Sequence, residues 1–296
     1  MKSEFFEINH KRLSRLVRTA CADAEILWDQ VNDEVPAFHF ITKNRECVHA
    51  IPLYNTDDTK LSDYLDFFSG GINQTAIIPI MSTFNKVETT DFFAVERPNL
   101  LEVEISKNMD KQWAKLHKSK RRNIRKLEPV LEFGMVKDND KLKEVFVDSY
   151  FKVQLTRSTI IAHFFDKESL LETINMDCSR LFFARDIREP SSMLMHLNFL
   201  VDETCFFVFS TNTSEGAKEY SASLHWYVIK QLARDQTYKL YSLGGGLRKD
   251  DGIEKFKIQL GATPKARRYL IYPKQKYKEG FFFPKSHAFL SSVYVG

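Results

Sequence analysis

Hydrophobic and polar positions alternate regularly along the second half of the chain. In some segments apolar residues recur at every second position, which is typical of a half-buried strand. In others they recur at every third or fourth position, which is typical of an amphipathic helix. These patterns predict strands over residues 132–138, 179–188, 192–202, 205–212, 238–243 and 266–274. They predict helices over residues 140–154, 166–176, 215–235 and 251–260. Along the chain the order is strand, helix, helix, three strands, helix, strand, helix and strand. This order indicates an α/β (α+β) domain with a largely antiparallel sheet.

The first hundred residues predict another mixed α/β unit. The segment 10–31 has helical spacing, with Leu13, Leu16, Val17 and Ala20 on one side. Alternating apolar and polar positions predict strands over 37–44, 46–55, 75–84 and 100–106. We therefore expect one helix followed by strands in this part of the chain.

A basic segment lies between these two parts. Residues 110–128 carry four apolar residues at helical spacing, and Pro129 marks the end of the predicted helix. Residues 111–128 include eight Lys or Arg and one Glu. We expect this helix to join two domains, 1–107 and 108–296. The four apolar residues are Trp113, Leu116, Ile124 and Leu127.

The basic surface of this helix has two interpretations. A Lys-rich helix face is commonly only solvated. Arg121, Arg122 and Arg125 could instead give bidentate contacts to a phosphate, a pyrophosphate or a nucleic acid. A nucleic-acid interface also needs interleaved aromatic residues or a recognised module, and only Trp113 lies nearby.

Composition and charge favour a globular protein of the cytoplasm. A hydrophobic content of 43% and 25 Phe are enough for a sizeable core. The net charge is only +4, so binding of an anionic partner would depend on where the basic residues cluster. We expect no membrane-spanning helix, since no run approaches about 18 apolar residues, and no signal peptide. The cysteines have no CxxC spacing, so we expect reduced thiols and no metal site. They are Cys21, Cys47, Cys178 and Cys205.

Three consecutive glycines, Gly244, Gly245 and Gly246, separate the strand at 238–243 from the helix at 251–260. Glycines at a helix start can expose amides to phosphate, but the sequence matches neither GxGxxG nor GxxxxGK[ST]. A tight turn whose backbone lines a cleft is the favoured interpretation. Lys257 follows just over one helical turn beyond it. It is either a solvated lysine or a cation placed to neutralise a developing oxyanion.

His196 is the remaining candidate for chemistry. Strand alternation places Leu194, His196 and Asn198 on one face, where the histidine is either a half-buried structural residue or a general base. The sequence contains neither HExxH nor GxSxG, which leaves no support for a zinc protease or a serine hydrolase.

Three stretches together resemble one known family. They are LHKSKRRNIRKLEPVLEFG at 116–134, STNTSEGAKEYSASLHWYVIKQLARDQTYKLYSLGGG at 210–246, and GIEKFKIQLGA at 252–262. Their order and spacing resemble the FemAB-like and CelD-like branch of the GNAT acyltransferase superfamily, over roughly residues 108–272. The usual acetyl-CoA loop of GNAT proteins, Q/RxxGxG/A, is missing before the long helix.

The resemblance implies two GNAT-like halves, each with a mixed, mostly antiparallel sheet flanked by helices, the first half being degenerate. It implies a donor that is an acyl-CoA, such as acetyl-CoA, or an aminoacyl-tRNA. The implied acceptor is an amino sugar, a polysaccharide or a peptidoglycan-type precursor of cell-envelope biosynthesis. Lys257 would then stabilise the tetrahedral intermediate with help from Gly244–Gly246, while Arg121, Arg122 and Arg125 would contact phosphates.

The leading hypothesis is therefore an acyl- or aminoacyltransferase with Lys257 and His196 as its catalytic candidates. A competing hypothesis is a non-enzymatic nucleic-acid-binding protein that uses the helix at 111–126. A third is a relative of the fold that has lost activity.

Overall fold

The computed structural model describes two units. The described residues are 25–31, 35–41, 47–50, 74–81, 93–137, 140–156, 167–201, 203–245 and 252–272. One unit holds the described residues from Leu100 to Pro264, and the other holds those up to Asn99 and from Lys265 onward. The second unit is therefore assembled from two separate parts of the chain. The domain boundary between 107 and 108 stays a prediction.

The unit from Leu100 to Pro264 is built on a mixed sheet with the order β5-β10-β9-β8-β7-β6. Neighbouring strands are antiparallel except β9 and β10, which run parallel. The strands are β5 (Phe93–Glu104), β6 (Leu131–Val136), β7 (Ser179–Asp186), β8 (Met193–Val201), β9 (Thr204–Asn212) and β10 (Leu240–Ser242). The mostly antiparallel sheet flanked by helices that the sequence predicts is confirmed.

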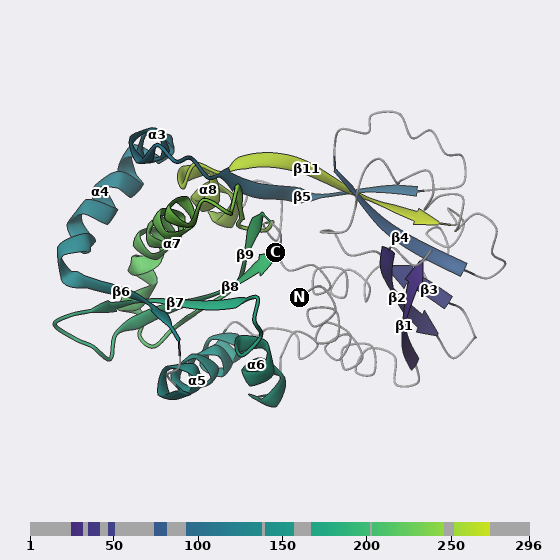
Figure 1. Ribbon diagram of the computed structural model, residues 1–296, viewed down its shortest axis with the longest axis horizontal. Helices are drawn as coiled ribbons and strands as arrows, with labels where there is room; N and C mark the ends of the chain where they lie inside the picture. Colours follow the sequence, from purple (N-terminus) through teal and green to yellow (C-terminus); the bar gives the residue numbers. More distant parts are fainter. Residues whose placement is uncertain are drawn as a thin grey trace. The chain divides into compact units, whose positions relative to one another are not determined.

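Helices cover both faces of this sheet (Figure 1). On one face, α5 (Asp140–Thr156) and α6 (Lys167–Ile174) lie together, and Tyr150 of α5 packs edge-on against Phe209 of β9. On the other face, α7 (Ser221–Asp235) follows the short helix η5 (Gly216–Tyr220). The hydrophobic core lies mainly under α7, because apolar residues of α7 and of the strands alternate onto that side. Its fully buried members include Leu101, Val103, Ile124, Leu194, Leu224, Val228, Ile229 and Tyr241.

In the other unit, the described strands have the order β1-β2-β3-β4-β11. Again the neighbours are antiparallel except for one pair among the described strands, β3 and β4. The strands are β1 (Glu25–Val31), β2 (Val35–Ile41), β3 (Cys47–Ala50), β4 (Gln74–Met81) and β11 (Thr263–Tyr272). The helix expected over 10–31 is wrong for its last seven residues, which form β1; residues 10–24 lie outside the described residues. Pairing of β1 with β2 along its whole length overrides the local helical spacing.

The predicted helix at 110–128 is also corrected, because it is two helices. They are α3 (Met109–Lys115) and α4 (Lys118–Leu127), and the short helix η3 (Glu128–Val130) follows α4. Leu116 and His117 between them are extended, and Nδ1 of His117 accepts a hydrogen bond from the Ser119 amide at the start of α4. The break also lets the His117 amide donate to the carbonyl of Gln259 at 2.9 Å. Gln259 ends α8 (Gly252–Gln259), so the break ties α4 to the helix that carries Lys257.

The end of α7 offers a test of local backbone strain. Gln236 has φ 63 in the left-handed region, and its amide donates to the Leu232 carbonyl. Only glycine adopts this conformation without steric cost. We expect Gln236→Gly to raise the free energy of unfolding by about 0.5–1 kcal/mol, measured by urea denaturation. The matched variant Gln236→Ala keeps the Cβ, so it should give no gain; a gain of equal size from alanine would contradict this explanation.

Candidate functional site

The parallel strands β9 and β10 part after three residues. Leu240, Tyr241 and Ser242 pair with β9 on one side and with β5 on the other, and from Leu243 the pairing continues with β5 alone in the described structure. The Leu243 amide donates to the Leu101 carbonyl at 2.8 Å, and the Leu101 amide donates to the Gly244 carbonyl at 3.1 Å. Beyond this point β9 continues to Asn212 without β10 beside it in the described part of the chain. Leu243 and Gly244, which follow β10, are buried, and Gly245 is half-buried.

The first two glycines lie at this split. Gly244 has φ 70, which requires the left-handed conformation that glycine adopts freely. The carbonyl of Gly245 accepts a hydrogen bond from the Lys257 ammonium at 2.7 Å. Gly246 lies outside the described residues. The structure thus brings Lys257 and Gly245 together, while their role as a cleft wall stays a prediction.

Lys257 is held in the last turn of α8. Its side chain is only 8% exposed, whereas Lys255 on the same helix is exposed. The amides of Leu260 and Ala262 donate to the Lys257 carbonyl and fix the end of the helix. Burying a lysine is costly unless its charge is compensated. Lys257 is therefore held in place by burial and by the Gly245 carbonyl, and the solvated alternative is excluded.

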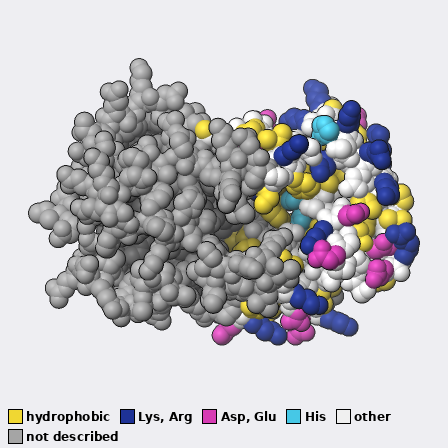
Figure 2. Space-filling model, turned by 180° about the vertical axis from the view of Figure 1, so that it is seen from behind, with side chains coloured by type: hydrophobic (Ala, Val, Ile, Leu, Met, Phe, Trp, Pro, Cys, Tyr) yellow, Lys and Arg dark blue, Asp and Glu magenta, His cyan; other side chains and the backbone are white. Residues whose placement is uncertain are grey.

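Two histidines and a tyrosine form a cluster at the split, and the Lys257 charge acts on one of them, His225. The rings of His196 on β8 and His225 on α7 have centroids 4.3 Å apart, and Phe207 of β9 lies 4.9 Å from each. Nδ1 of His225 lies 2.9 Å from the hydroxyl of Tyr241 on β10. On the face shown in Figure 2, histidine side chains are visible between hydrophobic ones. The chain thus gathers groups from three strands and two helices beside the split.

Burial keeps both imidazoles of this cluster neutral. Desolvation lowers the pKa of His196 to about 3. Desolvation also lowers the pKa of His225 well below 6.5, and the neighbouring His196 and the Lys257 charge lower it further. Burial raises the pKa of Tyr241 well above 10, so its phenol keeps its proton. Neither the two imidazoles nor the phenol carries a charge at neutral pH.

His196 itself is enclosed by the sheet and α7. It has no exposed surface, and neither of its ring nitrogens has a hydrogen-bond partner in the described structure. The side-chain oxygen of Asn198, two residues along β8, is likewise buried without one. A pKa of about 3 makes an imidazole a weak proton acceptor at neutral pH. A general-base role of His196 stays a prediction, and the burial and low pKa of this histidine do not favour it.

The predicted phosphate-binding arginines lie on α4. Arg122 and Arg125 are exposed and Arg121 is half-buried. The Arg125 guanidinium lies 5.4 Å from the Trp113 ring, and the Lys120 ammonium lies 4.3 Å from the Phe256 ring of α8. Burial lowers the pKa of Lys120. No ion pair is formed by any of the six basic residues of α4 within the described part of the chain. This surface is therefore positive and not neutralised by described carboxylates.

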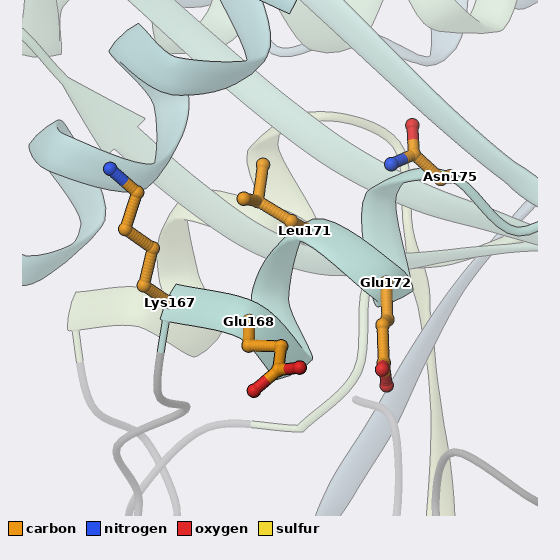
Figure 3. Close-up of a pocket in the computed structure, with 5 residues that line it drawn as sticks. All are labelled: Lys167, Glu168, Leu171, Glu172 and Asn175. Carbon is orange, nitrogen blue, oxygen red and sulfur yellow. The ribbon is translucent and has the colours of Figure 1, made fainter.

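A separate hollow of about 620 Å³ lies along α6 (Figure 3). Its described lining side chains come from this helix and from the residue after it: Lys167, Glu168, Leu171, Glu172 and Asn175. The amide oxygen of Asn175 accepts from the Lys143 ammonium at 2.7 Å. None of the predicted site residues belongs to this described lining. The described lining includes positively and negatively charged side chains but no nucleophile, so we assign the hollow no function.

Sequence reasoning did not identify His225 and Tyr241. His225 stands in the apolar face of α7 between Leu224 and Trp226, and Tyr241 stands in a strand, positions that are usual for core residues. Only the alternation of β10, which places Tyr241 inward, offered a signal.

The described residues show neither a metal site nor a membrane-spanning helix. They contain no group of three or more His, Cys, Asp or Glu arranged to hold a metal ion. None of their helices combines the length and the apolar character that crossing a membrane requires.

Comparison with known proteins identifies the fold. The structure matches that of FemX with a TM-score of 0.62 at 9% identity, over 91% of this chain and 93% of the other. It matches the C-terminal domain of a putative lysylphosphatidylglycerol synthetase from Agrobacterium fabrum with a TM-score of 0.61 at 11% identity, over 98% and 95%. It matches L-PGS from Bacillus licheniformis with a TM-score of 0.55 at 10% identity, over 95% of both chains.

No protein-family model matches the sequence, and no curated protein matches it either. The resemblance to FemAB-like proteins is therefore confirmed as a likeness of fold. At these identities, function has to be argued from the site.

Proposed function

We propose that this protein is an acyl- or aminoacyltransferase that acts at the split between β9 and β10. The observation that carries the proposal is the buried Lys257, held 2.7 Å from the Gly245 carbonyl beside that split. The likeness in fold to a putative lysylphosphatidylglycerol synthetase, over nearly the full length of both chains, supports it. A lysine held beside the glycine backbone at the split suits a reaction in which negative charge develops on oxygen.

The proposed chemistry is nucleophilic acyl transfer. The lone pair of the acceptor amine or hydroxyl forms a bond to the donor carbonyl carbon, and the electron pair of the C=O bond moves to oxygen. When the tetrahedral intermediate collapses, the bond to the thiolate of a thioester or to the ribose oxygen of an ester breaks, and the acceptor loses one proton. Lys257 would stabilise the oxyanion, because an ammonium carries three hydrogen-bond donors and a full charge.

We propose an acyl-CoA, such as acetyl-CoA, or an aminoacyl-tRNA as donor. Both carry phosphates, which suit the arginines Arg121, Arg122 and Arg125 of α4. The proposed acceptor is an amino sugar, a polysaccharide or a peptidoglycan-type precursor, and the proposed location is the cytoplasm. His196 is not needed for this chemistry in its buried neutral form.

A transfer assay with labelled donors tests the proposal. Purified protein is incubated with acetyl-CoA or with a mixture of charged tRNAs, each labelled in the acyl group, and with amino-sugar and peptidoglycan-precursor acceptors. We expect label in the acceptor from one of the two donor classes, at a rate that is proportional to enzyme. If neither donor transfers label, and calorimetry detects no binding of acetyl-CoA, CoA or tRNA, the proposal is wrong.

The uncompensated charge of α4 favours a second candidate function, nucleic-acid binding without catalysis. Both functions predict that Arg121→Ala with Arg125→Ala weakens donor or RNA binding. If tRNA binds through several phosphates, the logarithm of its binding constant should fall steeply with the logarithm of the salt concentration. In the variant, this slope should become shallower by about 0.7–0.9 for each phosphate that is no longer neutralised. A CoA donor should give a much shallower slope from the start. We would measure this by fluorescence anisotropy between low and physiological salt.

The matched control for that pair is Lys137→Ala with Lys141→Ala, which removes two exposed charges near the start of α5. An equal loss in the control would mean that only net charge matters, and not α4. Tight tRNA binding with no transfer from charged tRNA would favour the non-catalytic function.

A further inference from the structure

The contact between His225 and Tyr241 fixes which ring nitrogen of His225 carries the proton. Tyr241 is fully buried, and its hydroxyl has one hydrogen-bond contact in the described structure, Nδ1 of His225 at 2.9 Å. If Nδ1 carried the proton, the hydroxyl would accept it and its own O–H would remain without an acceptor, which is costly in a buried site. The hydroxyl therefore donates to Nδ1, and the proton of the neutral imidazole is on Nε2.

The surroundings of His225 keep it in this neutral donor form. His196 faces it from β8 at a ring distance of 4.3 Å, and the positive charge of Lys257 acts on it from α8. Phe207 and Phe256 pack against the same ring at 4.9 and 6.1 Å. No carboxylate among the described residues contacts it, so nothing favours the imidazolium. A neutral imidazole can donate a hydrogen bond without becoming charged.

His225 is also the accessible member of the pair. It keeps 3% of its surface exposed, whereas His196 keeps none. It lies in the first half of α7, the helix that connects β9 with β10, and it contacts Phe207 of β9 and Tyr241 of β10. Sites that stabilise an oxyanion generally present more than one donor, because the developing charge has several lone pairs to satisfy.

We propose that His225 donates its Nε2–H to the oxyanion as the second donor beside Lys257, and that Tyr241 positions it by holding its tautomer. The inference rests on the proposed transferase function and adds a catalytic residue to that site. It assigns no proton transfer to His225: the proton lost by the acceptor goes to solvent or to the leaving group.

Two measurements test this inference together. The first is the ¹⁵N spectrum of protein labelled in its histidine rings, with His225→Gln used to assign the signal. We expect a neutral Nε2–H tautomer for His225 between about pH 5 and pH 8, and a mixture of tautomers in Tyr241→Phe. An Nδ1–H tautomer, or titration near the ordinary pKa of about 6.5, overturns the inference.

The second measurement is the turnover of His225 variants in the transfer assay. We expect His225→Leu to lower kcat about 10²-fold with little change in KM, and His225→Gln, which keeps an N–H donor, to lose about tenfold. The exposed Lys255→Met serves as the control. Undiminished turnover in His225→Leu overturns the inference and leaves the transferase standing. Absence of transfer by the unaltered protein from every donor overturns the proposed function itself, whatever the tautomer.

Discussion

Lys257→Met should lower turnover about 10²–10³-fold, corresponding to about 3–4 kcal/mol of lost transition-state stabilisation. Methionine fills most of the volume of the lysine stem, so the packing of α8 on the core should survive. The substitution removes the ammonium that donates to the Gly245 carbonyl, and with it the only positive charge we place at the oxyanion. The loss should appear in kcat more than in KM, because the charge it stabilises exists only in the transition state.

Lys255→Met is the matched control, since Lys255 is exposed on the same helix. It removes an equal charge without touching the split, and its turnover should stay within about twofold of the unaltered protein. Circular dichroism and urea denaturation would establish that both variants fold. Full activity in a folded Lys257→Met protein would show that the lysine is structural, and the proposed mechanism would fail at its central residue.

Sequence periodicity was sufficient for the order of elements from β6 to β11, because the strands and helices of that region are strongly amphipathic. It failed at residues 110–128, where four apolar residues fit one continuous helix. The break at Leu116 and His117 depends on a cap by the His117 ring and on a bond to the Gln259 carbonyl, and the second of these comes from a distant part of the chain. Tertiary contacts of this kind leave no local signal.

Prediction of the site from the sequence is limited in the same way, because its residues meet only through tertiary contacts. Lys257 and the glycines could be predicted, because a turn of glycines before a helix is recognisable locally. The role of His225 could not, because its neighbours His196, Tyr241 and Lys257 come from two strands and another helix. The missing GNAT acetyl-CoA loop is a local fact of the sequence. It favours neither donor until binding is measured.

The two buried neutral histidines should make the folded protein less stable in mild acid. The pKa of His196 is about 3 in the folded protein and about 6.5 when unfolded, so between these values the unfolded state binds more protons. The stability contributed by the neutral form is fully present above about pH 6.5 and is lost as the pH falls toward 3. At pH 5 the loss from His196 alone should be about 2 kcal/mol. His225, whose pKa is lowered in the same direction, adds to it.

The effect can be separated from that of the carboxylates by its pH window. The Asp186 carboxyl, whose pKa the Arg188 hydrogen bonds lower to about 2, loses its contribution only below about pH 4. We would measure the free energy of unfolding by urea denaturation at half-unit steps from pH 7.5 to pH 5. The slope of wild type should approach about 1.4 kcal/mol per pH unit for each buried histidine below 6.5.

His196→Leu removes one titrating ring and should reduce that slope by about half. Leucine also removes two buried nitrogens that have no described partner, so the variant need not be less stable at pH 7.5. An unchanged slope in His196→Leu would mean that His196 is protonated or hydrated when folded. The burial argument would then fail for His225 as well, because the two rings share one environment, and a neutral donor beside Lys257 would lose its physical basis.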